Sequence, residues 1–464
     1  MAAAGDDPAI ATLIDDQLDL QASLRGQVID PQHPDFDLAR GIFNGAITRR
    51  PALIVRPIDA ADVVTAIEFA RAAELPLSVR GGGHNVAGHA VCEGGLMLDL
   101  RLLRGVEVDE TTRVAEAGGG ATWNDFDPPC QRHGLATTGG TFGTTGIGGL
   151  TLGGGIGHLM GRYGLTLDNL LQAEVVTADG RVLLASEDEH SDLFWALRGA
   201  GGNFGVVTRF FYRLHELPPL TAGLLVYDFA NANAVIRSFR TVVEDAPDEL
   251  TFVLVLGHDG ASGAAVVVVA VCWSGDSEDA RGRLDALRSM PGLLLDAVRP
   301  TSYLQLQAIF GEIPFGLRHY WKGHFVTAMP DEAIEFVVEH FARRRSPLGS
   351  VLIEPLEGQA KRVPEDATAF ANRHAAFNVS GLSIWESPDD DDEQIAWARA
   401  FGDGVAPYSS RGGGYLNYMG SDEPLERVQA AFGAEKFARL REIKQKFDPD
   451  NVFRQNQNIP PAGS

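Results

Sequence analysis

Three dense clusters of glycine are the part of this 464-residue sequence that most directly suggests chemistry. The first is Arg80 to Asn85, the second spans residues 139–157, and the third runs from Arg198 to Gly205. Because glycine has no Cβ, several backbone N–H groups in such a loop can converge on an anion. The clusters therefore predict a cofactor that carries phosphate groups. Loops that need only positive φ angles would explain one cluster more easily than three.

The common nucleotide-binding motifs do not account for these glycines. A Rossmann fold requires GxGxxG between a strand and a helix, but His158 and Phe204 stand where two GxG triplets would need their third glycine. No GxxxxGK[ST] loop is present either. The usual binding sites for dinucleotides and nucleoside triphosphates therefore lose their main support.

Composition and charge exclude further classes of protein. Hydrophobic residues make up 45% of the chain and charged residues 22%, which is typical of a globular protein and not of a disordered one. Against 39 basic residues stand 62 acidic ones, so the formal net charge is −23. This charge disfavours nucleic acids and anionic membrane surfaces. We expect a small-molecule substrate instead, and the oligomeric state cannot be predicted.

Cysteine, histidine and the first residues indicate the compartment. Cys92, Cys130 and Cys272 are too few and too far apart for a disulfide framework. No CxxC or HExxH spacing is present, so no metal site is predicted. The N-terminus lacks a basic region followed by an apolar one, and no apolar run reaches about 18 residues. We therefore expect a cytoplasmic protein.

The elements that must position the glycine clusters follow an α+β pattern. Up to Pro218-Pro219, short strands alternate with helices, and a strand over residues 75–80 runs directly into the first cluster. Beyond that point, apolar strands alternate with longer helices at Asn231–Glu244, Asp279–Met290 and Asp331–Arg345. Residues 425–447 are expected to form one helix that ends at Asp448-Pro449.

Long motifs in this sequence resemble one known family. VRGGGHNVAGHA, GTTGIGGLTLGGGIGHLMGRYG and DLFWALRGAGGNFGVVT are similar to the flavin-binding domain of the berberine-bridge-enzyme-like oxidoreductases, which belong to the vanillyl-alcohol-oxidase-type (PCMH-type) FAD superfamily. The closing YLNYMG and KFDPDNVFRQNQNIPP resemble the C-terminus of that family. The similarity covers most of residues 47–218 and 411–464, in order and spacing.

The resemblance implies a two-lobed vanillyl-alcohol-oxidase-type FAD-binding fold with an α+β substrate domain. The expected division is an N-terminal helix (Ile10 to Leu24) and connector over residues 1–46, the FAD-binding domain over 47–218, the substrate-binding domain over 219–410, and a C-terminal segment over 411–464 that returns to the FAD domain.

His84, in GGGHN, stands where family members bond the flavin 8α-methyl carbon covalently. Such a bond withdraws electrons from the flavin ring and eases hydride acceptance. Many relatives add a second bond from a cysteine, but Phe142 occupies that position here, and Cys130, like the other two cysteines, is expected to be a small buried residue. The resemblance therefore implies FAD with a single covalent link, to His84.

The remaining residues that the resemblance assigns to the cofactor surround this histidine or lie in the later motifs. They are Arg80, Gly81, Gly82, Gly83, Asn85, Gly88, Gly140, Thr144, Thr145, Gly148, Gly149, Gly153, Gly154, Gly157, Val207, Tyr415 and Asn417.

Two residues are candidates for acid–base catalysis. Tyr418, in the YLNY motif, corresponds to the phenol that acts as a base in some relatives, and Glu354 leaves a strand where relatives place a Glu or Tyr over the flavin. An unperturbed Tyr has a pKa near 10, and a Glu near 4.3 is a weak base unless burial raises its pKa. We favour Tyr418 as the direct base with Glu354 as its partner; a surface carboxylate is the alternative for Glu354.

These residues imply an FAD-dependent oxidoreductase that takes a hydride from a CH–OH or CH–N group. Thr145 stands where a small Val accompanies oxidase behaviour in relatives and a larger Leu suppresses it, which favours reoxidation by dioxygen to hydrogen peroxide. A dehydrogenase with another acceptor, or a flavin-binding protein without catalysis, remains open. Tyr320, Trp321 and His324 could face a substrate, and they suit a sugar, a phenol, an alkaloid or a polyketide equally.

Overall fold

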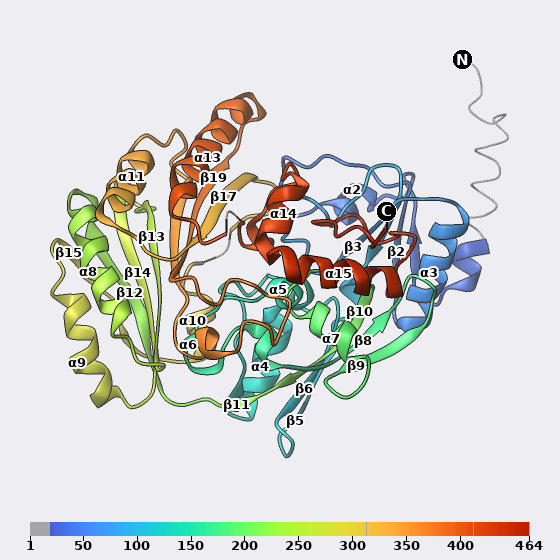
Figure 1. Cartoon of the computed structure of the whole chain (residues 1–464), viewed down its shortest axis with the longest axis horizontal. Coiled ribbons are helices and arrows are strands. Elements are labelled where there is room, and N and C mark those ends of the chain that lie inside the picture. The colour runs from blue at the N-terminus through green and yellow to red at the C-terminus, as the bar shows by residue number, and fades with distance from the viewer. Residues whose placement is uncertain (1–18, 312, 412, 464) are drawn as a thin grey trace.

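The computed structural model describes residues 19–311, 313–411 and 413–463. One large sheet with its helices occupies one side of the molecule, and the four-stranded and five-stranded sheets occupy the other (Figure 1). The expected N-terminal helix lies largely outside the described residues. In the part of the chain that is described, no helix combines the length and the apolar character needed to cross a membrane.

A four-stranded sheet carries the first glycine cluster. Its strands have the order β1-β2-β4-β3, in which β2 and β3 are both parallel to β4. Their bounds are β1 Gln27–Ile29, β2 Leu53–Arg56, β3 Leu77–Arg80 and β4 Leu96–Asp99, with helices α2 Phe36–Arg40 and α3 Ala60–Ala72. Asp59 caps α3 by accepting a hydrogen bond from the N–H of Asp62. Because β3 ends at Arg80, the glycines that follow emerge at the carboxyl edge of the sheet.

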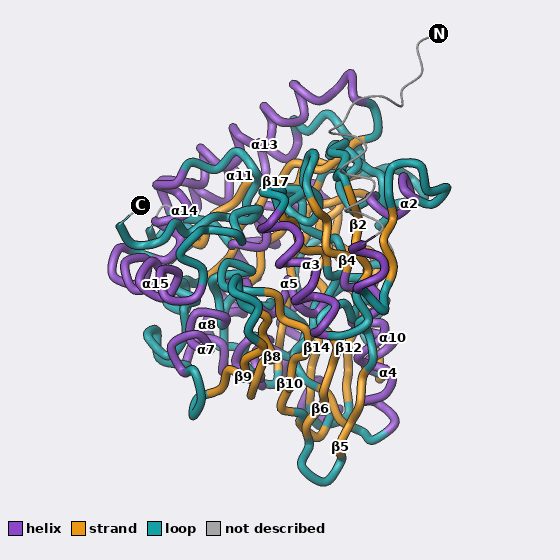
Figure 2. Tube along the Cα trace, turned by 90° about the vertical axis from the view of Figure 1, so that its right-hand side faces the viewer, coloured by secondary structure: helices purple, strands orange, loops and turns teal. Residues whose placement is uncertain are grey.

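A five-stranded antiparallel sheet follows, with the order β5-β6-β10-β8-β9 (Figure 2). Its strands are β5 Val106–Asp109, β6 Val114–Gly118, β8 Leu170–Val176, β9 Val182–Ser186 and β10 Val206–Arg213. The accompanying elements are α4 Trp123–Arg132, α5 Ile147–Gly153, α6 Met160–Tyr163, α7 Ser191–Leu197 and the strand pair β7 Leu135–Ala136 and β11 His215–Glu216. The second glycine cluster thus contains a short helix, α5, that its glycine-rich sequence does not predict.

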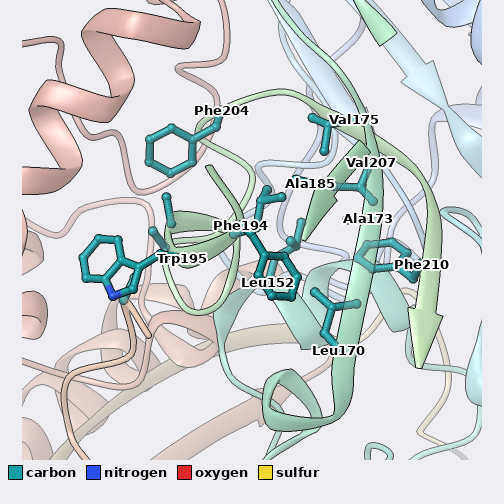
Figure 3. Close-up of a cluster of buried hydrophobic side chains, with 14 of the residues drawn as sticks. Leu152, Leu170, Ala173, Val175, Ala185, Phe194, Trp195, Phe204, Val207 and Phe210 are labelled. Carbon is teal, nitrogen blue, oxygen red and sulfur yellow. The ribbon is translucent and has the colours of Figure 1, made fainter. Parts of the chain in front are cut away.

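The core of this half is built from apolar side chains that point inward from both the sheet and the helices. Figure 3 shows Phe210 of β10 and Phe194 and Trp195 of α7 among the side chains of this cluster, all of them at most 5% exposed. Burying such side chains supplies roughly 25 cal/mol for each Å² of apolar surface removed from water. This packing holds α5, through Ile147 and Leu152, in the same core cluster as Phe210 of β10.

The large sheet begins with β12 directly after Pro218-Pro219 and has the order β15-β12-β14-β13-β18-β19-β17, with β16 paired to β12. Its strands are β12 Leu220–Asp228, β13 Leu250–His258, β14 Ala265–Ser274, β15 Leu293–Asp296, β16 Arg299–Thr301, β17 Arg318–Val326, β18 Ser350–Pro355 and β19 Phe377–Trp385. The helices are α8 Ala232–Glu244, α9 Ser277–Arg288, α10 Tyr303–Gln307, α11 Asp331–Ala342, α12 Gln359–Arg362 and α13 Asp391–Val405. The long strands and helices expected after residue 219 are confirmed.

The long helices of this half cover one face of the large sheet. Alternate residues such as Leu254 and Ile353 belong to one core cluster with side chains of α8 and α11 (Figure 1). Because side chains alternate along a strand, the intervening residues point to the opposite face. That face lines the candidate site.

The C-terminal segment forms two helices, α14 Leu425–Phe432 and α15 Ala434–Phe447. The expectation of one continuous helix is wrong, because Gly433 adopts φ = +79° and redirects the chain. Side chains of both helices, including Phe432 and Phe437, join the core cluster that contains Trp195. The apolar faces of α14 and α15 therefore pack against the smaller sheets, while Arg427 of α14 also donates a hydrogen bond to the Gly323 carbonyl of β17.

Candidate functional site

A cavity of ≈ 470 Å³ is lined by the glycine-rich loops and by the face of the large sheet opposite its long helices. The first and second glycine clusters line it from one side, together with residues of the third cluster and of the C-terminal tail. Strands β13, β17, β18 and β19 contribute side chains from the other. The cavity therefore joins segments that are distant in the sequence.

The structure brings together at this cavity most of the residues predicted for the site. Those that line it are Gly81, Gly82, Gly83, His84, Asn85, Thr144, Thr145, Gly148, Gly149, Val207, Tyr415, Asn417, Tyr418 and Glu354. Six others do not line it: Arg80, Gly88, Gly140, Gly153, Gly154 and Gly157.

The six residues outside the lining have protein neighbours that explain their identity. A Cβ on Gly153 would lie 2.1 Å from the Asn417 side-chain oxygen, and one on Gly157 would lie 1.7 Å from the carbonyl oxygen of Gly139. Arg80 is 3% exposed and donates to the carbonyl of Ala39 at 2.7 Å. These residues hold the loops against one another rather than facing the cavity.

The lining glycines fit a bulky cofactor in close contact with backbone. A Cβ on Gly82 would lie 2.4 Å from the backbone nitrogen of Gly146, so the first and second clusters meet backbone to backbone. Gly149 and Gly202 line the cavity and have open space where a Cβ would project. A larger side chain at either position would fill space in the cavity next to the backbone. Glycine keeps that space free, as expected for loops that a flavin dinucleotide approaches closely.

His84 is held by aromatic rings and one hydrogen bond. Its ring stacks on Phe43 with centroids 4.6 Å apart and meets the edge of Phe315 at 5.4 Å. Nε2 lies 3.0 Å from the Thr144 hydroxyl. Burial, together with the positive charge of Arg80, lowers the pKa of His84 to about 4, so the imidazole is neutral at physiological pH.

No cysteine lies at this cavity among the described residues. All three are buried, and Cys130 lies on α4, where burial raises the pKa of its thiol. Phe142 lines the cavity with its ring 5.9 Å from that of Phe310. Phe142 therefore presents an apolar ring, and no nucleophile, to the cavity.

Glu354 and Tyr418 meet at the cavity although 64 residues separate them. The Tyr418 hydroxyl donates to Oε1 of Glu354 at 3.1 Å, and the Asn378 amide donates to Oε2 at 2.7 Å. Glu354 lies on β18 and is 4% exposed, whereas Tyr418 lies in the C-terminal segment and is half-buried. The surface-carboxylate alternative for Glu354 is wrong.

Burial changes the acid–base properties of this pair. Desolvation raises the pKa of Glu354 to about 7, and the hydrogen bonds from Asn378 and Tyr418 only partly offset it. Burial and the neighbouring Glu354 carboxyl raise the pKa of Tyr418 well above 10. At neutral pH the pair thus contains a neutral phenol and a carboxyl group that is balanced between its two forms, which suits proton transfer.

Two aromatic neighbours orient Tyr418. The Trp321 ring packs edge-on against it at 5.3 Å, and the Tyr415 ring at 4.8 Å. The Tyr415 hydroxyl in turn accepts from the N–H of Gly155 and from the Asn417 amide, both at 2.9 Å. The YLNY motif is therefore a preorganised unit fixed to the second glycine cluster.

Only one of the three residues suggested as facing a substrate reaches the cavity. Trp321 lines it, whereas Tyr320 and His324 lie on the other face of β17, as strand alternation requires. The Tyr320 hydroxyl donates to Asp422 at 2.6 Å, and His324 is buried next to Arg427.

Sequence reasoning missed part of the lining. Gly201, Gly202 and Gly205 of the third cluster line the cavity, as do the amides of Gln455, Asn456 and Gln457 in the tail. The third cluster was visible in the sequence and could have been included by the same argument. The tail amides carry no comparable local signal, because the fold alone brings them to the loops.

The residues of the site contain the donors of a flavin cradle and not of a metal centre. Among residues 19–463, as far as they are described, no three His, Cys, Asp or Glu side chains gather in a way that could hold a metal ion.

Comparison with known proteins agrees with this arrangement. The family described as FAD binding domain matches residues 51–186, and the family described as berberine and berberine like matches residues 414–460. The chain is 34% identical over 456 residues to (R)-6-hydroxynicotine oxidase from Paenarthrobacter nicotinovorans, covering 95% of this chain and 98% of that protein. It is 30% identical over 424 residues to an FAD-linked oxidoreductase of Dictyostelium discoideum, covering 90% and 91%.

Among solved structures, the crystal structure of 6-hydroxy-D-nicotine oxidase from Arthrobacter nicotinovorans matches with a TM-score of 0.86 at 31% identity, covering 94% of this chain and 98% of that one. The fold is therefore the two-lobed vanillyl-alcohol-oxidase-type FAD-binding fold with an α+β substrate lobe.

The chain belongs to the berberine-bridge-enzyme-like family of FAD-linked oxidoreductases. It is an FAD-binding enzyme of the FAD-linked oxidase class.

Proposed function

We propose that this enzyme oxidises a CH–OH or CH–N group of a small molecule by hydride transfer to FAD bound covalently at His84, and that dioxygen then accepts the electrons to give hydrogen peroxide. The observation that carries the proposal is the Tyr418–Glu354 hydrogen bond at the same cavity that the glycine clusters line. It combines an acid–base pair with a site built for a flavin.

His84 suits a covalent link because its imidazole is neutral and fixed. The contact of Nε2 with Thr144 leaves Nδ1 as the ring atom for a bond to carbon. Phe43 and Phe315 hold the ring plane. With Phe142 in place of a second nucleophile and every described cysteine away from the cavity, a single link is the arrangement that the residues support.

The FAD, when bound, supplies the acceptor for a hydride. The protein must then take one proton from the hydroxyl or amine of the substrate. We infer that Tyr418 takes that proton while its own proton passes to Glu354, since the hydroxyl already donates to the carboxylate at 3.1 Å. Glu354 ends protonated, and its pKa of about 7 makes this transfer nearly balanced at neutral pH.

The two lobes divide this work. Residues 47–218 and 411–464 form the flavin-binding unit in this proposal, and 219–410 form the substrate unit. Two observations support this division. The apolar side chains of α14 and α15 share a core cluster with α7. The first strand of the large sheet in the sequence, β12, begins at Leu220.

The proposal is tested by incubating the holoenzyme with a panel of alcohols, phenols, amines and sugars in air. Peroxide release together with bleaching of the flavin in the absence of oxygen is expected for at least one substrate. Anaerobic bleaching without peroxide release in air would favour the dehydrogenase. A flavin that no substrate bleaches would favour a binding protein.

A further inference from the structure

The substrate-facing wall of the cavity is built from aliphatic side chains. On β13, Val253 and Val255 line the cavity, and on β19 Leu382 and Ile384 do so. Leu352 occupies the centre of the cavity-lining row on β18. Their neighbours along β13 and β18, such as Leu254 and Ile353, belong to the core cluster behind the sheet, so strand alternation sets this face apart from that core.

Polar groups are nearly absent from this wall. Apart from the Trp321 indole, β13, β17, β18 and β19 contribute to the cavity lining only the hydroxyl of Ser350 and the carboxyl of Glu354. On β17, Lys322 is paired with Glu423 and Tyr320 with Asp422, so both point away from the cavity. The His319 ring lies on the Trp321 side of the strand, where it stacks on Phe43 at 4.3 Å. The sheet thus brings one acid–base group to the cavity, held by the Asn378 amide, within a lining of the sheet that is otherwise mostly aliphatic.

Aromatic side chains complete the lining. Phe142 and Phe310 face each other at 5.9 Å with their planes 35° apart, and Phe310 stacks on His158 at 6.1 Å. Trp321 stands edge-on to Tyr418. Flat, apolar rings bind well between such side chains.

A sugar would bind more weakly to this surface. Each hydroxyl that leaves water for an aliphatic wall without a partner weakens binding by roughly tenfold. A disaccharide carries several hydroxyls, and the wall offers partners for only one or two of them.

We propose that the substrate is an uncharged, apolar ring compound with one hydroxyl or amine at the carbon to be oxidised, and that oligosaccharides are excluded. This inference rests on the proposed function, since it names the substrate class for the same site. The reaction removes a hydride from the C–H bond and a proton from the O–H or N–H bond of that group, leaving a carbonyl or an imine, while FAD and then dioxygen take the two electrons.

The test uses the flavin absorbance of the holoenzyme to measure the binding of two product analogues. One is 2-acetonaphthone, an uncharged apolar ketone, and the other is cellobiono-1,5-lactone, the product expected from a disaccharide. The dissociation constant of the ketone is expected to be at least about 100-fold lower than that of the lactone, because two or more hydroxyls of the bound lactone would lack a hydrogen-bond partner. Equal or tighter binding of the lactone, or no spectral response to the ketone up to its solubility limit, would overturn the inference.

Variants locate the effect on the wall. Leu352→Gln places an amide in the centre of the wall and is expected to weaken ketone binding roughly tenfold or more. Val255→Thr keeps the side-chain shape and should weaken it less, which covers the case in which Leu352→Gln fails to fold. Leu295→Gln, on the same sheet at β15 and 52% exposed, is the matched control and should bind the ketone like the parent enzyme. Unchanged ketone binding in both wall variants would contradict the proposal.

Turnover separates this inference from the proposed function. If the ketone binds selectively but no alcohol or amine bleaches the flavin, the proposed function fails and the apolar site stands. If cellobiose bleaches the flavin and releases peroxide, the function stands and the substrate class is wrong.

Discussion

The two sides of the cavity are built on different principles. On the side of the glycine clusters the backbone itself forms the surface, with Gly82 and Gly146 in contact and Gly149 open to the cavity. On the side of the large sheet, side chains such as Leu352 and Ile384 form the surface. A backbone-built site demands glycine at fixed positions, whereas a strand surface keeps its fold with many side chains. Cofactor binding therefore depends on glycine motifs that can be recognised in the sequence. Substrate binding depends on side chains that can vary without changing the fold.

The largest expected effect comes from a substitution on the cofactor side of the cavity. His84→Ala should abolish the covalent bond, so that acid precipitation of the protein leaves no yellow colour in the pellet. The matched control is His89→Ala, because His89 also lines the cavity and burial likewise lowers its pKa to about 4. This control should retain the colour in the pellet.

Two results would contradict this part of the account. Release of intact FAD from the denatured parent enzyme would remove the covalent link. A flavin-bearing peptide that contains a cysteine would refute the single link.

Tyr418→Phe acts where the two sides meet. Removing the phenol should slow anaerobic flavin reduction by about 10²–10⁴-fold, the usual contribution of a positioned acid–base group, while covalent FAD remains. Stopped-flow absorbance measures the rate. Tyr320→Phe is the control, since the Tyr320 hydroxyl binds Asp422 on the opposite face of β17, and its rate should match the parent. A parent-like rate in Tyr418→Phe would leave Glu354 as the candidate base.

Glu354→Gln keeps the shape of the wall and removes its only carboxyl group among the described lining residues of the large sheet. Flavin reduction should slow by roughly tenfold to 100-fold, less than for Tyr418→Phe, because the phenol still faces the substrate. Glu357→Gln, at a carboxyl that does not line the cavity and pairs with Lys361, should not change the rate. Equal rates in both variants would exclude Glu354 from the reaction.

The same substitution has a stability signature whose sign follows from the pKa of Glu354. Burial raises that pKa to about 7, above the value near 4.3 of an unfolded chain, so the folded state holds the proton more tightly. The stability that this proton provides is present below pH 4 and is lost as the pH rises through 7. Thermal unfolding should therefore show that the stability of Glu354→Gln rises relative to that of the parent between pH 5 and pH 8. A difference in stability that does not change with pH would contradict the raised pKa.

The smallest expected effect concerns dioxygen. Thr145 lines the cavity on the glycine side, and Thr145→Leu should slow reoxidation of the reduced enzyme several-fold by filling space beside the flavin. Thr145→Val, which has the same size as the parent side chain, should reoxidise normally. The two rates are measured by mixing the reduced enzyme with aerated buffer. Reduced parent enzyme that persists in air for minutes would favour the dehydrogenase instead.

Much of the fold and cofactor side could be predicted from the sequence, because local signals determine them. The strand that ends at Arg80 and the glycines after it follow from apolar runs and backbone chemistry. The break at Gly433 was missed because the apolar pattern on either side of it continues. The contact of Tyr418 with Glu354 depended on resemblance, since no local pattern relates residues on different lobes.

The residues of the large sheet that line the cavity could not be predicted from the sequence, for a physical reason. Whether Trp321 or Tyr320 faces the cavity depends on the register of β17 against β19, and a shift of one residue would exchange them. Likewise, Leu352 and Ile353 are equally apolar in the sequence, and only the helices on one face separate the wall from the core.

The most direct test of the central claim is the pH dependence of anaerobic flavin reduction in the parent enzyme, Tyr418→Phe and Glu354→Gln. Because burial raises the pKa of Glu354 to about 7, its proton-accepting form increases as the pH rises through 7. The parent rate should therefore climb between pH 6 and pH 8 and then level off, and this step should vanish in Glu354→Gln. A parent profile without a step near pH 7, or a step that survives in Glu354→Gln, would contradict proton transfer through the Tyr418–Glu354 pair.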